Sequence, residues 1–524
     1  MDTAALVPLV VLVPLLGAAM ALAVPQRRNL QSLITFVSLT VVALIGVAMM
    51  VIIDVQDAPL VMAIGGWEAP VGIVLMADRL SAALVTTSAI VLIAVLVFSI
   101  GQRLSDGDEE TPVSIFFPSY LVLGAGVFDA FVANDLFNLY VAFEILLVAS
   151  YVLLTMGGTG PRIRAGITYI VVSLVSSVLF LAALGIIYGA TGTVSMAQLS
   201  IRIAELNPEI QLALNLLLLV AFGIKAAIFP LSFWLPDSYP TAPAPVTAVF
   251  AGLLTKVGIY AILRSQTMLF PESDINQLLM WMAALTLIVG ILGALSQRDI
   301  KRLLSFTLVS HIGYLLFGIA INTAAGFNAT VYYIIHHIIV QTTMFLCVGM
   351  IERVGGSTNM ERLSGLLKKA PLLAVMTFIT MMNLGGIPPF SGFLGKVGLF
   401  SAAAANPTAT HYWLIGIGTV VSLLTLNALI RMWTLSFWRP KSEIKDGQSM
   451  LQQLVDAPDL GPERGSREVP KLMTAATASM VVVCLGLTLF AGPLMSYADR
   501  AGRVLSDREL QIPWYVDPPQ EVKP

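Results

Sequence analysis

The chain has 524 residues, of which 57% are hydrophobic and 11% are charged, and its formal net charge is −2. Soluble globular domains carry roughly 25% charged residues, so this composition excludes an ordinary soluble protein and indicates an integral membrane protein. The near-zero net charge, without basic stretches interleaved with aromatic residues, argues against nucleic-acid binding.

Long apolar runs recur along the whole sequence. A membrane-spanning helix needs about 20 mostly apolar residues, and about fourteen runs reach that length. They are too long for strands and lack the period-two alternation of a membrane barrel. We therefore predict an all-α polytopic membrane protein. The expected spans are residues 4–24, 31–53, 79–101, 113–133, 136–156, 164–188, 210–230, 243–263, 276–296, 302–321, 327–351, 370–400, 409–437 and 472–496.

Basic residues predict how these spans are oriented. Most arginines and lysines outside the apolar runs lie in loops that follow odd-numbered spans, and the positive-inside rule assigns such loops to the cytoplasm. Both termini are then expected outside. The start, Met1-Asp2-Thr3, lacks the basic residues of a signal peptide, so we expect the first span to be retained.

Four ionisable residues lie inside apolar runs, where burying a charge costs on the order of a few kcal/mol or more. Glu144 lies in the fifth expected span, Lys225 in the seventh, Lys256 in the eighth and Lys396 in the twelfth. Such residues usually bind or relay ions. The alternative is that each side chain extends to the membrane interface. Because all four lie several residues from the ends of their spans, we favour ion relay.

Three histidines also lie in the middle of apolar runs, namely His311, His336 and His337. Histidine titrates near neutral pH and can shuttle protons, although each one could equally be a hydrogen-bonded packing residue. Neither cysteines nor a carboxylate cluster accompany them, so we expect no metal site.

Proline interrupts two of the lysine-bearing spans. Lys225 precedes Pro230 and Pro236, and the sequence Gly385-Gly-Ile-Pro-Pro389 precedes Lys396. Proline removes a backbone donor and breaks a helix, and at membrane depth the freed carbonyls persist only where protein or water satisfies them. Broken spans that carry a charge therefore indicate an ion path.

The positions of the interruptions suggest an internal repeat. Spans four to eight and spans nine to thirteen each contain five helices, and each set holds one broken, lysine-bearing helix. Because five is odd, the second set would be inverted relative to the first, as in many secondary transporters. The expected divisions are 1–112 (helices 1–3), 113–265 (first repeat), 276–437 (second, inverted repeat), 438–471 (cytoplasmic loop) and 472–524 (helix 14 and external tail).

The two cysteines, Cys347 and Cys484, both lie in apolar runs and are interpreted as small core residues. An iron–sulfur cluster needs about four thiolates, and neither a dinucleotide fingerprint nor a haem motif occurs in the sequence. We therefore expect no cofactor, and not an electron-transfer enzyme.

These residues suggest a proton relay. Burial favours the neutral form of a lysine, and a nearby carboxylate favours the charged form. If Glu144 approaches Lys225, a proton or cation entering nearby could loosen the pair and let Lys225 donate toward Lys256. Separating such a pair in a low dielectric costs energy, so the pair can act as a switch.

Several motifs resemble one family of membrane proteins, the antiporter-like subunits shared by respiratory complex I and Mrp-type cation/proton antiporters. The resemblance covers nearly the whole chain. Within that family, Gly65-Gly-Trp67 and Gly72-Ile-Val-Leu-Met-Ala-Asp78 resemble the D-type chains of Mrp antiporters. The motifs that carry the wider resemblance are Asn134-Asp-Leu-Phe-Asn-Leu-Tyr-Val-Ala-Phe-Glu-Ile145, residues 225–245, residues 297–314 and Gly385-Gly-Ile-Pro-Pro-Phe-Ser-Gly-Phe393.

The resemblance implies roles for individual residues. Glu144, Lys225, Lys256 and Lys396 match the family's membrane glutamate and lysines, and the three histidines fall where the family places relay groups. Many relatives carry lysine where this chain has Gln341, so water or histidine would have to bridge that position. The residues that we expect to carry ions are Glu144, Lys225, Lys256, Lys396, His311, His336 and His337.

The family also implies an activity and partners. We expect a component of a multisubunit Na+/H+ antiporter in the bacterial plasma membrane, assembled with Mrp subunits A, B, C, E, F and G. It would carry H+, Na+ or both, and it would be part of a transporter, not an enzyme. The alternative is the N-type subunit of NADH-quinone oxidoreductase, a redox-driven proton-translocating complex.

Overall fold

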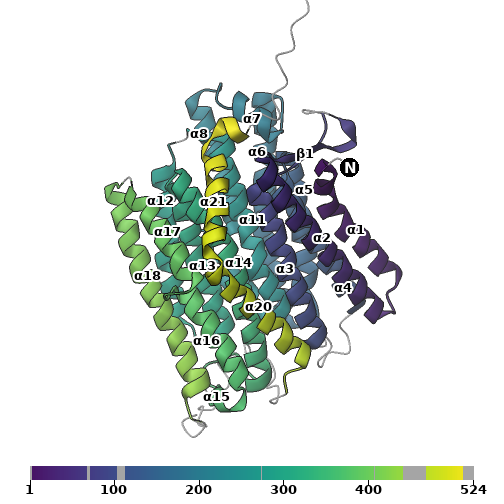
Figure 1. The fold of residues 1–524 in the computed structure, drawn as a ribbon, viewed down its shortest axis with the longest axis vertical. Helices are drawn as coiled ribbons and strands as arrows, with labels where there is room; N and C mark the ends of the chain where they lie inside the picture. The colour runs from purple at the N-terminus through teal and green to yellow at the C-terminus, as the bar shows by residue number, and fades with distance from the viewer. Residues whose placement is uncertain are drawn as a thin grey trace, which may run out of the picture.

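The structure is a computed structural model that describes residues 3–67, 71–102, 113–272, 274–405, 407–440 and 468–511. It is a bundle of long helices whose axes lie roughly along one common direction (Figure 1). In the described ranges, 13 helical segments are long and apolar enough to cross a membrane. One further span is divided into two short helices, so the expected polytopic architecture of about fourteen spans is confirmed.

The spans follow one another in order along the chain. The helices that build them are α1 (Leu6–Ala23), α2 (Arg28–Gln56), α3 (Arg79–Gln102), α4 (Val113–Val132), α5 (Leu136–Thr155), α6 (Gly160–Thr191), α8 (Pro208–Ala226), α10 (Ala244–Val249) continued by α11 (Thr255–Arg264), α12 (Asn276–Ser296), α13 (Ile300–Ala320), α14 (Ala324–Gly355), α16 (Pro371–Gly385) with α17 (Ser391–Ala405), α18 (Ala409–Trp433) and α20 (Lys471–Leu489) with α21 (Ala491–Ser506). Short helices are α7 (Met196–Arg202), α9 (Trp234–Ser238), α15 (Leu366–Lys369) and α22 (Arg508–Gln511).

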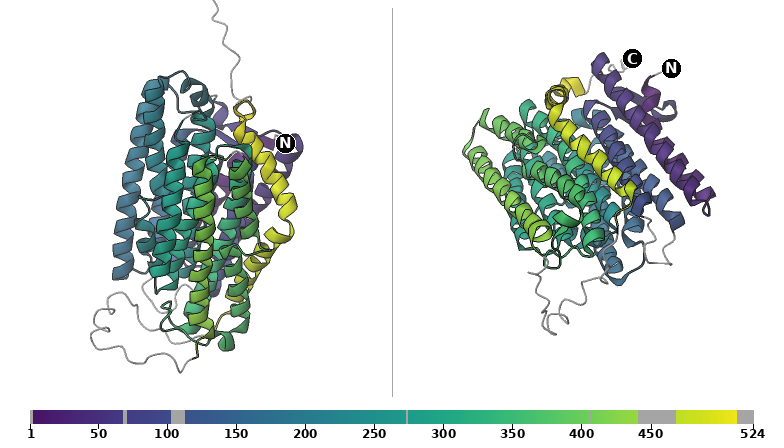
Figure 2. Two further views of the ribbon diagram at one scale, coloured as in Figure 1. Left: turned by 90° about the vertical axis from the view of Figure 1, so that its left-hand side faces the viewer. Right: turned by 60° about the horizontal axis from the view of Figure 1, so that its bottom comes forward.

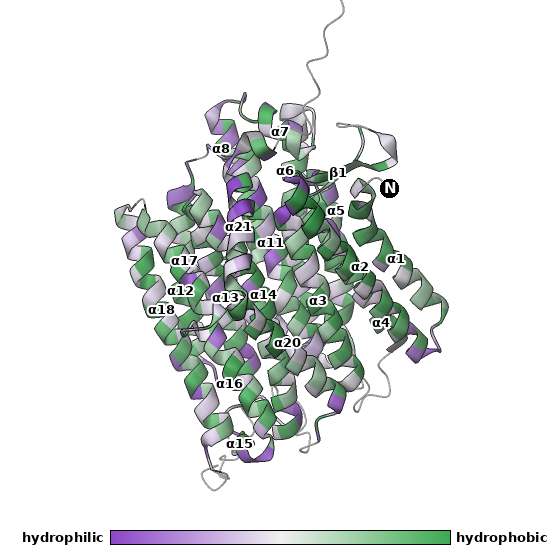
Figure 3. Ribbon diagram, viewed as in Figure 1, coloured by the Kyte–Doolittle hydropathy of each residue, from purple (hydrophilic) through white to green (hydrophobic). Residues whose placement is uncertain are grey.

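Burial separates central from peripheral helices. The most apolar stretch of α14 is entirely buried. The corresponding stretches of α13 and of the span that contains α10 and α11 are nearly as buried. On the periphery, α1, α2, α6 and α18 expose many large apolar side chains. Hydropathy colouring shows hydrophobic residues along the helices and hydrophilic residues concentrated near the ends of the bundle (Figure 3). This pattern fits a bundle surrounded by lipid.

One element departs from the all-α expectation. The strands β1 (Leu60–Ala63) and β2 (Val74–Ala77) pair antiparallel between α2 and α3. Gly65 and Gly66, just after β1, have φ of 71° and 75°, which glycine adopts without steric strain. The ribbon lies at the end of the bundle, where hydropathy does not distinguish a strand from a loop.

Both proline-interrupted spans are broken in the structure. The helix α8 ends at Ala226, Ala227 is left-handed with φ of 59°, and α9 begins at Trp234. The helix α16 ends at Gly385, Gly386 has φ of 79°, and α17 begins at Ser391. Each break therefore begins with a residue whose left-handed backbone ends the helix. Each broken span is the fourth helix in its set of five.

A third break lies in the last span, between α20 and α21 at Phe490. The helix α21 continues along α14 toward the end of the bundle that also carries α7, α8 and the start of α1 (Figures 1 and 2). The short helix α15 lies at the opposite end (Figure 1). Of the predicted loop 438–471, residues 441–467 lie outside the described part of the chain, as does the tail after residue 511.

Candidate ion-translocation site

Glu144 and Lys225 lie close to each other but are not joined directly. The Glu144 Oε1 atom, on α5, is buried and has no hydrogen-bond partner among the described residues. The Lys225 Nζ atom, near the end of α8, lies 5.7 Å from the centre of the Phe143 ring. The charge of Glu144 acts on Lys225, yet within the described chain no ion pair of 4.0 Å or less joins them. The two groups therefore influence each other electrostatically without forming an ion pair.

A small cavity lies beside Lys225. Its volume is about 20 Å³, enough for one water molecule. The hydroxyl of Tyr239 is buried without a partner in the described structure, so a water here would have a polar neighbour. The lining residues are Phe143, Leu146, Leu147, Tyr169, Ser173, Lys225, Trp234, Tyr239, Leu254, Val257 and Gly258. The cavity therefore lies between the end of α8 and the residues Leu254 and Val257, which flank Thr255 and Lys256 in sequence.

Lys256 is the most deeply enclosed of the three lysines. Its side chain is fully buried, and Nζ donates a 2.6 Å hydrogen bond to the carbonyl oxygen of Ala251. Residues Phe250–Leu254, just before it, form a π-helical turn, a distortion that is frequent at functional sites. The neighbouring Thr255 hydroxyl is buried and unpartnered in the described region. Lys256 therefore lies next to a local distortion of the helix and beside a hydroxyl that could form a further hydrogen bond.

The three histidines gather on α13 and α14. The rings of His311 and His337 are 5.1 Å apart, and the Tyr333 hydroxyl lies 3.3 Å from His311 Nδ1. The ring of His336 stacks on that of Tyr333, with 5.3 Å between the ring centres. All three imidazoles are fully buried. Neither ring nitrogen of His337 has a partner among the described residues, which leaves both available to water.

Lys396 lies beyond this cluster on α17. Its Nζ donates to Ser422 Oγ on α18 at 2.8 Å and to the carbonyl oxygen of Gly385 at 3.1 Å. The same ammonium lies 5.0 Å from the centre of the Tyr314 ring. Gly385 ends α16, so Lys396 interacts with the negative end of a helix dipole.

Contacts and electrostatic influence link the histidines to Lys256 and Lys396. His337 lies within electrostatic range of both Lys256 and Lys396. Tyr314 contacts the ring of His311, 5.7 Å away, and the ammonium of Lys396. The structure therefore places the three lysines and three histidines selected from sequence in the interior of the bundle, with Lys225 half-buried and the other five buried, and Glu144 lies near Lys225.

Gln341 is part of the same region. It is fully buried on α14, one turn after His337, and its Nε2 donates to the carbonyl oxygen of Leu304 at 3.1 Å. Its Oε1 has no partner in the described structure. At this position the chain therefore offers a neutral amide with one free acceptor.

Charges at the ends of the bundle form networks that the sequence does not reveal. Arg264 pairs with Asp78 at 2.6 Å, and both side chains are buried. Burial alone would raise the pKa of Asp78, but the Arg264 guanidinium and the Ser81 N–H lower it, so its pKa is below the ordinary value. Asp78 therefore belongs to a buried ion pair that joins the start of α3 to α11.

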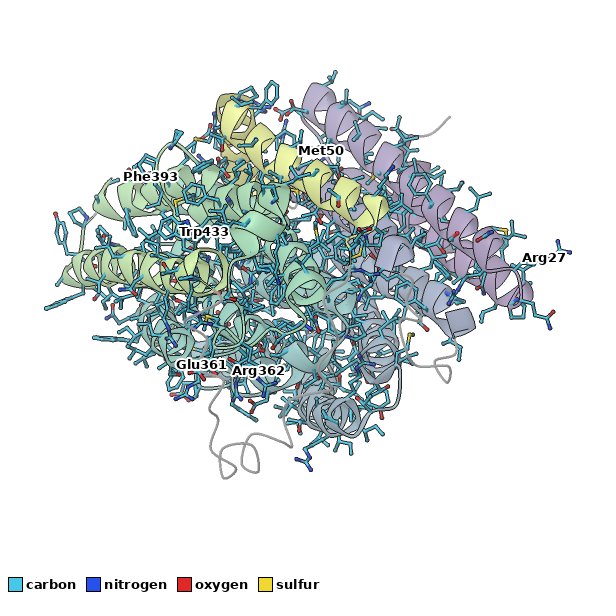
Figure 4. The ribbon with its side chains drawn as sticks, turned by 90° about the horizontal axis from the view of Figure 1, so that it is seen from below. Arg27, Met50, Glu361, Arg362, Phe393 and Trp433 are labelled. Carbon is cyan, nitrogen blue, oxygen red and sulfur yellow. The ribbon has the colours of Figure 1, made fainter. Side chains whose placement is uncertain are left out.

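Further ion pairs fix other elements. Asp54 accepts from Arg79 at 3.0 Å and from Arg500 at 2.7 Å, which ties α2, α3 and α21 together. Near the opposite end, Lys301 is buried and pairs with Glu352 at 2.8 Å. Viewed from below, Arg27 lies at the edge formed by α1, and Glu361 and Arg362 lie on a different side (Figure 4).

Metal-binding side chains do not cluster in the described part of the chain. Within it, no set of three or more His, Cys, Asp or Glu side chains is arranged to hold a metal ion. Cys347 and Cys484 are both buried free thiols. The chemistry of the site is therefore that of amines, imidazoles, hydroxyls and one carboxylate.

A helical membrane bundle whose broken spans carry buried charges has the architecture of a secondary transporter. The chain belongs to the NADH:quinone oxidoreductase/Mrp antiporter transmembrane family, which it matches over residues 133–425. It is a multi-pass membrane protein, and its homology to antiporter subunits supports a transporter.

Individual relatives agree with this family. The D subunit of the Na+/H+ antiporter of Alkalihalophilus pseudofirmus is 39% identical over 437 residues, which cover 83% of this chain and 87% of that protein. The corresponding D subunit of the Bacillus subtilis Na+/H+ antiporter is 39% identical over 385 residues, covering 73% and 77%.

Solved structures share the fold. A chain of the Mrp complex from Dietzia sp. superposes with a TM-score of 0.87 at 31% identity, covering 98% of this chain and 99% of that one. A chain of respiratory complex I from Thermus thermophilus superposes with a TM-score of 0.77 at 23% identity, covering 95% and 99%. At that lower identity the likeness concerns the fold alone.

Proposed function

We propose that this chain is the D-type component of a multisubunit Na+/H+ antiporter and that it relays protons coupled to Na+ export. The observation that carries the proposal is the set of interior amines and imidazoles from Lys225 to Lys396, in a chain 39% identical to antiporter D subunits. Buried amines and imidazoles in broken membrane helices are costly to maintain and are usually retained for ion transfer.

The relay would begin at Glu144 and Lys225. The two groups interact without direct contact, so a proton or cation that neutralises Glu144 weakens the hold on the Lys225 ammonium. The ammonium can then give a proton to water in the adjacent cavity of about 20 Å³. Such a water would pass the proton toward Lys256, whose helix lines the same cavity.

The second half of the relay would run through the imidazoles. The charges of Lys256 and Lys396 both act on His337. The ring centre of His311 lies 5.1 Å from that of His337. A neutral imidazole accepts a proton on one nitrogen and releases one from the other. His336, His337 and His311 would thereby carry charge toward Lys396, with water at the free acceptor of Gln341.

We further propose that residues 113–265 and 276–437 are inverted repeats. Asp135 accepts backbone N–H groups at the start of α5 and bridges to Ser195. Asp299 does the same at the start of α13 and bridges to Asn359. The two arrangements lie at opposite ends of the bundle, marked by α7 and α15 (Figure 1). Matching features at opposite ends are what inversion requires.

The surrounding assembly follows from the same proposal. We place the chain in the bacterial plasma membrane with both termini outside, with residues 1–112 as three preceding helices, 438–471 as a cytoplasmic loop and 472–524 as the last span and external tail. Its partners would be Mrp subunits A, B, C, E, F and G, with H+ and Na+ as transported ions and no resident cofactor. The N-type subunit of complex I is the competing assignment, since the matched family includes NADH:quinone oxidoreductase chains and a complex I chain shares the fold at 23% identity.

Everted membrane vesicles test the proposal. Na+-driven proton movement should disappear with Lys225→Ala and persist with Lys368→Ala, which removes an exposed lysine on α15. Co-purification of the other subunits shows that each variant assembles. Normal exchange by the assembled Lys225→Ala complex would refute the proposed relay.

A further inference from the structure

Two side chains at the break between α16 and α17, Ser391 and Asn383, have no part in the relay above but form a hydrogen-bond network with one of its histidines. His336 on α14 lies with Nδ1 2.9 Å from the hydroxyl oxygen of Ser391, the first residue of α17. The Ser391 hydroxyl in turn donates to Asn383 Oδ1, on α16, at 3.0 Å. The three residues come from three helices, and all three are fully buried. The network therefore joins a relay histidine to both sides of the helix break.

The direction of these hydrogen bonds fixes where the protons lie. The Gly392 N–H also donates to Asn383 Oδ1, at 3.1 Å, and an amide N–H can only donate. The Asn383 atom at that position must therefore be the carbonyl oxygen, an acceptor. The Ser391 hydroxyl has one hydrogen, and it is used toward Asn383. Toward His336 the Ser391 oxygen can only accept, so His336 carries its hydrogen on Nδ1 when neutral.

The other nitrogen of His336 is left as a base. His336 Nε2 is buried and has no hydrogen-bond partner within the described chain. A Cβ added to Gly392 would lie 3.1 Å from Nε2 and 2.0 Å from the carbonyl oxygen of Asn383. Glycine at this position therefore allows the imidazole to pack against the start of α17. In this tautomer Nε2 carries a lone pair that no described group uses, so it can receive a proton.

Ser391 is itself held in place from a third direction. Its backbone N–H donates to the Thr488 hydroxyl oxygen, on α20, at 3.0 Å. The first N–H groups of a helix have no partner within the helix. Here the donors of Ser391 and Gly392 are satisfied by side chains from two other helices. The start of α17, and with it the Ser391 hydroxyl, is therefore fixed beside His336.

We propose that Ser391 and Asn383 are positioning residues that hold neutral His336 in its Nδ1–H tautomer, so that Nε2 accepts the proton during relay. The transport part of this inference rests on the proposed function, whereas the tautomer does not. The groups around His336 are Lys396 on α17, His311 on α13, and Tyr333 and His337 on its own helix. Lys396 is the amine among them and lies across the same helix break.

Solid-state NMR of the full complex, labelled with 13C and 15N histidine and reconstituted in lipid, tests the tautomer directly. The His336 signal is identified by its loss in His336→Gln. We expect Nδ1–H in the unmodified complex and in Ser391→Thr, which keeps the hydroxyl. We expect loss of that preference in Ser391→Ala. An Nε2–H signal in the unmodified complex, or an unchanged Nδ1–H signal in Ser391→Ala, would overturn the assignment.

Transport separates the positioning role from a structural one. Exchange by the assembled Ser391→Ala complex should fall by about tenfold or more, within the range for displaced acid–base groups, and Ser391→Thr should restore it. The matched control is Thr380→Ala, which removes a buried α16 hydroxyl bonded to the carbonyl of its own helix at 2.8 Å. Equal losses in Ser391→Ala and Thr380→Ala, or no loss in Ser391→Ala, would contradict the role. If Lys225→Ala retains exchange while the tautomer result holds, the relay proposal fails and the tautomer assignment stands.

Discussion

The Lys396 ammonium donates to the carbonyl oxygen of Gly385 across the break between α16 and α17, over 3.1 Å. The break therefore supplies what an intact helix lacks, a free carbonyl at membrane depth that can hold a cation. In the other broken span the order is reversed, because Lys225 lies before its break and Lys396 lies after its own. Both lysines therefore lie close to interrupted backbone, Lys225 one residue before the end of α8 and Lys396 beside the end of α16.

Gly386→Ala should disturb this contact. Gly386 has φ of 79°, and an added Cβ would lie 2.8 Å from Lys396 Nζ. The left-handed backbone alone should cost about 1–2 kcal/mol, and the ammonium must move away from Gly385. We expect a lower thermal midpoint of the purified complex and a clear loss of Na+/H+ exchange. Gly486→Ala on α20, where no atom lies within 4 Å of the added Cβ, should change neither. Full exchange by Gly386→Ala would show that this contact is dispensable.

Asp78→Asn should destabilise the bundle. It leaves the buried Arg264 guanidinium without its ion-pair partner at 2.6 Å, and uncompensated buried charges cost about 3–5 kcal/mol. Asp499→Asn is the matched control, because Asp499 pairs with Arg503 on the surface of α21 and exposed pairs contribute about 1 kcal/mol or less. Chemical unfolding in detergent measures both. Equal stability losses in the two variants would mean that the Asp78 pair is not specially important.

The same pair has a defined pH dependence. The pKa of Asp78 is lowered in the fold, so its stabilisation is present above the unfolded pKa, about 3.9, and is lost as pH falls through the lower folded value. The stability difference between the unmodified chain and Asp78→Asn should therefore stay constant from about pH 8 to pH 5 and shrink only below about pH 4. A difference that already disappears near pH 6 would contradict the assigned ion pair.

Gln341→Leu should slow exchange. The buried Oε1 of Gln341 has no partner in the described structure and lies one turn from His337, where we place a relay water. Removing the amide removes that acceptor, and we expect a fall of about tenfold in dye-monitored exchange. Gln341→Lys should retain exchange, since a buried lysine amine can accept a proton when neutral and can also donate to the Leu304 carbonyl that the amide now uses. Unchanged exchange in Gln341→Leu would assign Gln341 to packing alone.

Hydropathy and proline positions predict a large part of this fold. The spans, the breaks beside Lys225 and Lys396, and the buried position of the histidines all depend on local sequence, because burial in lipid demands long apolar helices. The β1–β2 ribbon is missed because the residues between α2 and α3 lie at the end of the bundle. The Arg264–Asp78 pair and the Ser391–His336 contact join residues far apart in the chain, and no sequence spacing reveals such contacts.

Two segments between the spans carry a sequence similarity that hydropathy does not detect. The segment Gly192-Thr-Val-Ser-Met196-Ala-Gln-Leu-Ser200 and the segment Gly356-Ser-Thr-Asn-Met360-Glu-Arg-Leu-Ser364 have the same residue at their first, fifth, eighth and ninth positions. Each contains the residue that bridges to a helix-capping aspartate, Asp135 or Asp299. This similarity between the two segments gives the proposed repeat residue-level support that the apolar spans alone do not provide.

The measurement that tests the account most directly is Na+/H+ exchange by the purified, reconstituted complex with Glu144, Lys225, Lys256 and Lys396 neutralised one at a time. The account predicts that each neutralised complex assembles and loses exchange, whereas the Lys368→Ala complex exchanges normally. Normal exchange by assembled complexes that lack the Lys225 or Lys396 amine would contradict it.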